Sequence, residues 1–291
     1  MKAIKSIASS IEEENLRMEQ NNETDGRVAS SIKSVLSGTG SIVKGVADVA
    51  RDTAVTALKN VGDTGGAVLE VAGGIAGGAF KAVNDAGTGL VRTAKGLIVG
   101  IVEGVGEVAT ITVGTVSDVV RAAIKGTGGV GADVTKTAAG IAEGVIVATK
   151  STGMSVAEGA TELGRSVVGG VKDLGGDVVG AARSTVSGAM AGAAEIGGDA
   201  LEAVKNTAKG LVTGAGEVGS SVTDVTTGAI SGAIAGAKKI GVSAGDAAAA
   251  AAAGALQAAE EIGESAVHAV RDVAASGVDG VKGILKGDQD T

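Results

Sequence analysis

The chain has 291 residues, of which 51 are Gly and one is Phe, and it contains no Trp, Tyr, Pro or Cys. Aromatic side chains each bury about 150–250 Å² and dominate ordinary cores, so a conventional compact enzyme is not expected. The lack of Cys excludes disulfides, thiol nucleophiles and thiolate metal sites. The net charge of −8 argues against nucleic acid as a partner, because such binding needs a clustered basic surface.

Four segments follow one another along the chain. Residues 1–20 are polar and are expected to form a short helix, and residues 21–27 hold a cluster of Asn, Asp and Gly that is typical of a linker. Residues 28–286 show no comparable break, and residues 287–291 are expected to be a solvated tail. The chain begins without the apolar run of a secretory signal, and no charge-free run is long enough to span a bilayer. We therefore expect a cytoplasmic protein, peripheral at a membrane or lipid surface.

The long segment repeats with a period of eleven residues. Eleven residues fill three turns at 3.67 residues per turn, close to the 3.6 of an α-helix, so every eleventh residue stays on one side of a helix. Residues that are eleven positions apart form one column along the helix. Six columns that lie next to one another on the helix surface hold 134 positions between Ile42 and Leu285, and none of these positions is charged, although 20% of the chain is charged. The pattern predicts an all-α fold over residues 28–286. We expect one very long amphipathic helix, bent or broken at Gly pairs or assembled side by side.

The bulky residues of this uncharged face are the predicted site of contact with lipid or with other copies of the chain. They are Ile42, Leu58, Leu69, Ile75, Phe80, Leu97, Val102, Val108, Val113, Val119, Ile124, Val130, Ile141, Ile146, Leu163, Leu174, Ile196, Leu201, Val218, Ile240 and Ile262.

A second period, twice as long as the first, places glycines inside the same face. They are Gly131, Gly153, Gly175, Gly197, Gly219, Gly241 and Gly263. We interpret them as points where a neighbouring helix approaches closely, because lipid gains nothing from a missing side chain. Two other folds stay open: hairpins whose loops preserve the eleven-residue phase, and a β-solenoid, although the uncharged face follows steps of three and four rather than strict alternation.

The glycines make the helix costly. Each Gly makes the free energy of helix formation about 0.8–1 kcal/mol less favourable than Ala would, so an isolated helix of this composition should be largely unfolded in water. It becomes helical only when its uncharged face is covered. Three covers are possible: a lipid interface, other copies of the chain, or the chain folded back on itself.

Three short segments resemble the repeat core of the synucleins, Lys-Thr-Lys-Glu-Gly-Val. They are Arg92-Thr-Ala-Lys-Gly-Leu97, Lys136-Thr-Ala-Ala-Gly-Ile141 and Asn206-Thr-Ala-Lys-Gly-Leu211. The resemblance covers the periodic segment only, and it implies a chain that is disordered in solution and helical on lipid. This chain has fewer Lys, more Gly and a net acidic repeat region, so we expect lipid packing or curvature rather than lipid charge to control binding.

No residue pattern predicts catalysis, a cofactor or a metal site. His268 is the only His and occupies a charged column, and Glu12, Glu13 and Glu14 are best explained as a solvated helix face. We expect a non-enzymatic protein that coats or remodels a lipid surface. The alternative is a structural protein that assembles into helical bundles, coiled coils or filaments. Basic residues are favoured along one flank of the charged side of the helix and acidic residues along the other, so these flanks would pair between adjacent helices. The expected partners are lipid or copies of the chain, not nucleic acid or a small-molecule substrate.

Overall fold

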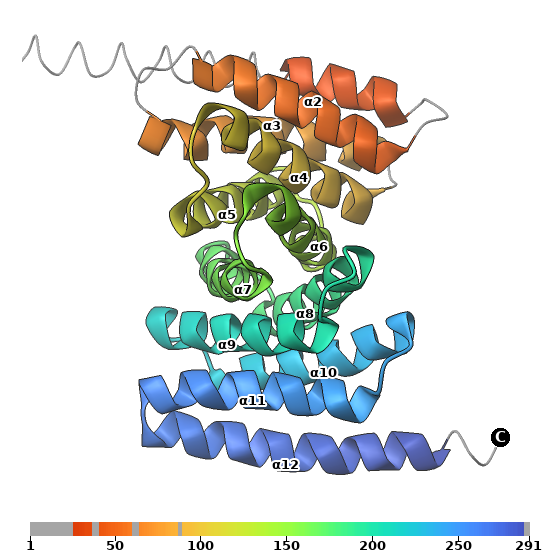
Figure 1. The fold of residues 1–291 in the computed structure, drawn as a ribbon, viewed down its shortest axis with the longest axis vertical. Helices are drawn as coiled ribbons and strands as arrows, with labels where there is room; N and C mark the ends of the chain where they lie inside the picture. Colours follow the sequence, from red (N-terminus) through yellow and green to blue (C-terminus); the bar gives the residue numbers. More distant parts are fainter. Residues whose placement is uncertain (1–25, 37–40, 60–63, 87–88, 288–291) are drawn as a thin grey trace, which may run out of the picture.

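The computed structural model describes residues 26–36, 41–59, 64–86 and 89–287, and their side chains except those of 64–67, 85–86 and 277–287. These residues are helical apart from short turns and contain no strand (Figure 1). The predicted all-α fold is therefore confirmed, and a β-solenoid is wrong for this part of the chain. The expectation of one very long helix is also wrong, because helices α2 to α12 have 17 to 24 residues each. The predicted N-terminal helix, most of the linker and most of the tail lie outside the described residues.

Residues 26–36 are helical. The helices that follow are α2 (Ile42–Lys59), α3 (Thr64–Ala86), α4 (Leu90–Val108), α5 (Val113–Gly129), α6 (Val134–Thr152), α7 (Val156–Asp173), α8 (Val178–Glu195), α9 (Ala200–Val218), α10 (Val222–Ile240), α11 (Ala244–Ile262) and α12 (Glu264–Gly287).

The helices form a two-layer stack. Most of them pack more extensively against the second helix along the chain than against the next one, because two reversals bring the chain back to the same side. Helices α2, α4, α6, α8 and α10 form one layer, and α3, α5, α7, α9 and α11 form the other. Helix α12 packs on α10 and α11 at the C-terminal end of the stack.

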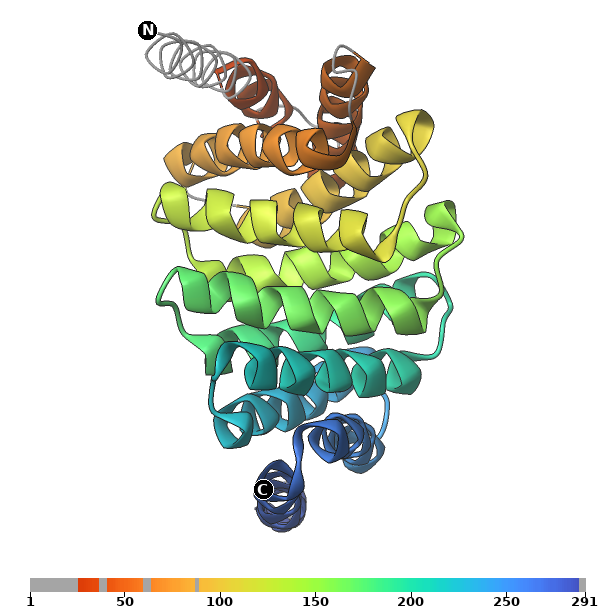
Figure 2. The ribbon, with the colours of Figure 1, turned by 90° about the vertical axis from the view of Figure 1, so that its left-hand side faces the viewer.

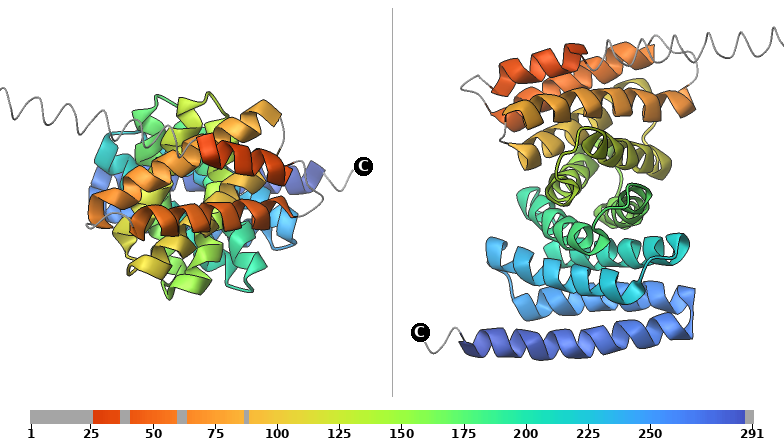
Figure 3. Two further views of the ribbon diagram at one scale, coloured as in Figure 1. Left: turned by 90° about the horizontal axis from the view of Figure 1, so that it is seen from above. Right: turned by 180° about the vertical axis from the view of Figure 1, so that it is seen from behind.

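The stack twists along its length. Helix α7 is seen nearly end-on in Figure 1, whereas the C-terminal helices α11 and α12 are seen nearly end-on in Figure 2, after a quarter turn of the molecule. The view from above in Figure 3 shows the same crossing of successive helix pairs. The arrangement is that of an α-solenoid, in which each repeat contacts mainly its neighbours.

The turns between α5 and α11 share one sequence feature, a Gly followed two residues later by Ser or Asp. The Gly ends the preceding helix in the left-handed conformation, with φ between 62° and 78°. The Ser or Asp begins the next helix by accepting a hydrogen bond from an amide of its first turn. Asp177 Oδ1, for example, accepts from the amide of Gly180 at 2.9 Å, and Ser221 Oγ accepts from that of Asp224 at 3.2 Å. This short turn reverses the chain once in every two eleven-residue repeats.

The glycines of the longer period therefore have a different role from the predicted one. Gly131, Gly153, Gly175, Gly197, Gly219, Gly241 and Gly263 all have positive φ, and a Cβ added to any of them would meet nothing within 4 Å. The prediction of close helix packing at these glycines is wrong. Six of them have φ between 62° and 78°, and an L-residue with a side chain pays about 1–2 kcal/mol in this left-handed conformation. Gly263 has φ 140°, which side-chain-bearing residues also rarely adopt.

Other glycines, inside the helices, bring neighbouring backbones of one layer together. A Cβ on Gly192 of α8 would lie 2.8 Å from the carbonyl oxygen of Glu143 in α6, and one on Gly214 of α9 would lie 2.8 Å from that of Arg165 in α7. Gly210 lies even closer to the backbone of Thr161. Such close backbone contacts gain packing energy, and a side chain in place of the glycine would prevent them. The residues that weaken the isolated helix are thus the ones that allow the stack to pack.

Candidate functional site

The predicted lipid or assembly face forms the interior of the stack. Its buried members are Leu58, Ile75, Phe80, Leu97, Val102, Val119, Ile124, Ile141, Ile146 and Leu163. Its half-buried members are Ile42, Val108, Val130, Ile196, Leu201, Val218 and Ile240, and its exposed members are Leu69, Val113, Leu174 and Ile262. The structure thus brings most of the face together against the chain itself, which is the third of the three covers considered for the uncharged face.

Some large apolar side chains of the face stay exposed. The described residues expose seven such side chains in all: Leu69, Val91, Val113, Leu174, Val179, Val242 and Ile262. All but Val242 belong to the six uncharged columns of the eleven-residue repeat. They lie mainly in the first turns of helices or beside the turns that join them. The stack therefore covers the middle of each helix well and the ends of the helices less completely.

Charged residues of neighbouring helices pair across each layer. A basic residue of one helix contacts an acidic residue of the second helix along the chain in several places. These pairs include Arg51 with Glu107 at 3.5 Å, Lys95 with Glu143 at 2.9 Å, Arg165 with Glu217 at 2.7 Å and Lys209 with Glu261 at 3.1 Å. The sequence suggested such pairing between separate rods, and the structure forms it within one chain.

Lys95 holds the most enclosed of these clusters. Its side chain is 11% exposed and contacts Glu143 of α6 and Glu195 of α8. Burial alone would lower the pKa of the Lys95 ammonium, but hydrogen bonds to Glu195 and Glu143 outweigh burial and raise that pKa above its ordinary value. Because the pKa is raised on folding, the pairing stabilises the fold fully below the ordinary lysine pKa of about 10.4 and is lost as the pH rises through the raised value.

Lys95→Met should lower the free energy of unfolding by about 1–2 kcal/mol at neutral pH, since two carboxylates lose their partner and Glu195 keeps solvent contact. The difference from the wild type should shrink at a pH above the raised pKa of Lys95, where the ammonium is neutral in both the folded and the unfolded state. Urea denaturation at the two pH values tests this. Lys136→Met, which removes an exposed pair with Asp133, is the control and should cost less than about 0.5 kcal/mol. A Lys95→Met cost that does not change with pH would contradict the role given to the ammonium.

A network of hydrogen-bonded polar side chains joins α5 to α7. Ser117 Oγ lies 2.9 Å from Ser166 Oγ, and Ser166 Oγ donates to Glu162 Oε1 at 2.9 Å. Ser166 and Glu162 are buried. Burial raises the pKa of the nearby Asp118, Arg121 lowers it, and Glu162 raises it further. Each hydroxyl is used to bridge the helices, so the cluster has the character of a structural link rather than of an activated nucleophile.

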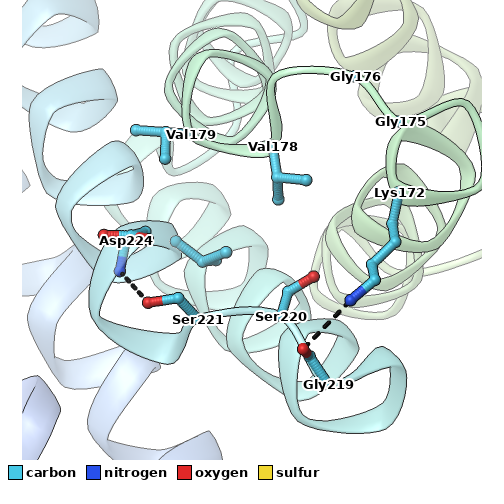
Figure 4. Close-up of a pocket in the computed structure, with 10 residues that line it drawn as sticks. Lys172, Gly175, Gly176, Val178, Val179, Gly219, Ser220, Ser221 and Asp224 are labelled. Carbon is cyan, nitrogen blue, oxygen red and sulfur yellow. Dashed lines mark hydrogen bonds between the residues drawn. The ribbon is translucent and has the colours of Figure 1, made fainter.

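A small surface cavity of about 410 Å³ lies where the α7–α8 turn meets the α9–α10 turn (Figure 4). Lys172 Nζ reaches across it and donates to the carbonyl oxygen of Gly219 at 3.1 Å. Ser221 Oγ is occupied by the amide of Asp224. Of the two hydrogen bonds drawn in Figure 4, the one from Lys172 joins the two turns and the one to Ser221 caps α10, so these polar groups serve the structure of the turns.

Of the remaining sequence candidates, His268 lies within the described residues. His268 is exposed, and its Nε2 lies 3.8 Å from Glu264 Oε1 one helical turn away. Within the described part of the chain, no three His, Asp or Glu side chains gather as metal ligands would. Glu12, Glu13 and Glu14 lie outside the described residues. None of the described helices combines the length and the apolar character needed to cross a bilayer.

The three segments that resemble the synuclein core lie near the start of α4 and of α6 and in the middle of α9. Their threonines, Thr93, Thr137 and Thr207, are fully buried. No protein-family model matches the chain, and no curated protein matches it.

Proposed function

We propose that this is a non-enzymatic lipid-surface protein that stores its amphipathic helix as a folded stack and opens the stack onto a lipid surface. The observation that carries the proposal is the position of the exposed apolar residues. All but one of those described lie in the uncharged columns, so they join the buried residues of the same face once neighbouring helices separate. An interfacial helix gains affinity with the apolar area that it places in the lipid boundary.

The composition of the core favours such opening. The buried residues are mostly Ala and Val with scattered Ile and Leu, and Phe80 is the one buried aromatic side chain of the described residues. Burial stabilises by about 0.8 kcal/mol per CH₂ group, so small side chains give each helix a modest share of stability. At a lipid interface the same apolar side chains would be removed from water to a comparable extent.

The alternative, a filament or bundle built through the Gly, Ala and Val face, has less support. That face is already occupied within one chain, and the acidic and basic flanks pair there as well. In copies that kept the stack intact, most of this surface would already be buried within each chain and could not contact another copy. Catalysis, nucleic-acid binding and a small-molecule substrate are not part of the proposal.

The natural lack of Trp allows a direct test. Three single-Trp variants are mixed with small phosphatidylcholine vesicles that contain bromine-labelled chains, which quench nearby Trp fluorescence. Val179→Trp places the probe on an exposed residue of the uncharged face, Phe80→Trp places it in the core, and Lys125→Trp, exposed in a charged column, is the control. Quenching is expected in the first two variants and not in the third.

Each other result has a definite meaning. Quenching of Val179→Trp without Phe80→Trp would contradict opening, because the intact stack would then rest on lipid by its exposed residues alone. No quenching in any variant, with vesicles of high or low curvature, would overturn the proposal. Circular dichroism of the free variants shows whether Phe80→Trp keeps the helical fold, and Val179→Trp decides the question of binding if it does not.

A further inference from the structure

The connection between α11 and α12 differs from the turns before it. It consists of a single residue, Gly263, between Ile262 at the end of α11 and Glu264 at the start of α12. Gly263 has φ 140° and ψ 174°, whereas the turn glycines between α5 and α11 have φ between 62° and 78°. As a glycine, it also has no side chain with which to cap α12, unlike the Ser and Asp residues that begin α6 to α11.

Gly263 already makes the hydrogen bonds of a continuous helix on both sides. Its amide donates to the carbonyl oxygen of Ala259 at 2.9 Å, and its own carbonyl oxygen accepts from the amide of Val267 at 3.2 Å. Both bonds span four residues, as in an α-helix. A change of φ and ψ at this one residue would therefore fuse α11 and α12, and it would supply helical partners to the amides that start α12.

The end of α11 also favours continuation. Its last turn holds Glu260 and Glu261 and no basic residue. Carboxylates are unfavourable at the negative end of a helix dipole, and that end disappears when the helix continues. A Cβ at Gly263 would meet nothing within 4 Å, so a side chain at this position would not clash with its surroundings, and the bend is held by the packing of α12 on α10 and α11.

Helix α12 lies at the C-terminal end of the stack, so it can leave without separating other helices. It packs on α10 and α11 at the end of the stack, and it buries Ala266 and Val270 there. If α11 and α12 fuse, α12 moves away from its own stack and uncovers that surface on α10 and α11. The α12 of a second copy matches the vacated surface, since it carries the same residues.

We propose that two copies of this chain exchange α12, with α11 and α12 fused through Gly263, to form a reciprocal swapped dimer. Each α12 then makes its original contacts on the partner, so the exchange forfeits little packing. In such a dimer Glu260 and Glu264 of the two copies would lie near the crossing, and their repulsion would favour the monomer at low ionic strength, whereas Glu261 is paired with Lys209. The dimer should increase with protein concentration and with salt. This inference does not depend on lipid binding.

Spin labels at Ala249→Cys and Asp272→Cys test the exchange in a chain that has no other Cys. Both positions are exposed. In the bent form they lie on two helices packed against each other, and in a fused helix they are about 35 Å apart at 1.5 Å per residue. Doubly labelled protein is diluted into excess unlabelled protein, so that only distances within one chain are measured. Light scattering gives the mass, and the long distance is expected in the dimer alone.

Gly263→Ala should strengthen the dimer by about tenfold or more, because Ala disfavours the bent conformation and favours the helix. Gly241→Ala is the matched control: its φ is 78° and its Cβ would also be free of contacts, but a three-residue turn separates its helices. This control should lose stability without dimerising. Insertion of Gly-Ser-Gly after residue 263 in the Gly263→Ala chain should restore the monomer.

Two results would overturn the proposal. One is a Gly263→Ala protein that stays monomeric at high concentration and high salt. The other is a dimer in which the labels keep their short distance, because that dimer would form through another surface. If Gly263→Ala does not fold, as judged by circular dichroism, the concentration series of the labelled protein with the natural Gly263 decides between the two forms.

Discussion

Gly210→Ala is expected to lower the free energy of unfolding by about 2–3 kcal/mol, although Ala is the better helix former. Gly210 lies in α9 against α7, and an added Cβ would overlap the backbone of Thr161, including its carbonyl oxygen. Backbone atoms of a packed helix have little room to move, so the two helices would have to separate. Urea or thermal denaturation followed by circular dichroism measures the loss.

Gly73→Ala is the matched control for this prediction. Gly73 also lies inside a helix, α3, but a Cβ there would meet nothing within 4 Å. The substitution should therefore stabilise the protein by up to about 1 kcal/mol, through helix propensity alone. If Gly210→Ala stabilised the protein as Gly73→Ala does, α7 and α9 would not approach each other as closely as the structure has them.

Phe80→Ala is expected to lower the free energy of unfolding by about 3–5 kcal/mol, the usual cost of removing a buried Phe side chain. Phe80 is fully buried in α3. Leu69 belongs to the same helix and to the same eleven-residue column, but it is 45% exposed. Leu69→Ala should cost less than about 0.5 kcal/mol, as most substitutions at exposed positions do. Denaturation of the two variants in the absence of lipid measures the contrast.

This contrast separates the stack from an isolated amphipathic helix. On such a helix in water, residues of one column share one environment, and the two substitutions would have similar effects. Phe80→Leu provides a milder change at the buried position and should cost less than about 1.5 kcal/mol. Equal losses for Phe80→Ala and Leu69→Ala would show that the stack does not form in solution.

The same physics links stability to the proposed function. Interior glycines such as Gly210 lower helix propensity and raise packing, so they favour the stack over an open helix. Substitutions that harm the stack but favour the helix should release the uncharged face. On the proposed function, Gly210→Ala would then be less stable in solution and would bind vesicles more readily than the natural chain.

The two kinds of glycine could not be distinguished by the longer period alone. A local signal was nevertheless present. Gly197, for example, is followed two residues later by Asp199, which caps α9, and the same Gly-x-Asp or Gly-x-Ser pattern recurs at each turn from α5 to α11. A helix-ending Gly followed by a helix-capping residue predicts a reversal of the chain. Interior glycines such as Gly192 and Gly210 lack such a neighbour.

Part of the site was also predictable. The uncharged columns indicated one apolar face, and most of its predicted bulky residues are buried or half-buried in the stack, although Leu69, Val113, Leu174 and Ile262 are exposed. The separate acidic and basic flanks indicated that charges would pair between neighbouring helices. What covers the face was not predictable. Phe80 and Leu69 have the same place in the repeat, and their different exposure depends on which parts of α3 lie under neighbouring helices.

The residues by themselves determined helical structure, one uncharged face and the segregation of charge, because these follow from the spacing of side chains along a helix. Only the tertiary structure decided that the helix is folded back on itself. The physical reason is that two eleven-residue repeats fill six whole helical turns, so a reversal once in every two repeats leaves every column in place. A long rod and a stack of short helices therefore share one pattern, and the difference between them lies in the few residues of each turn.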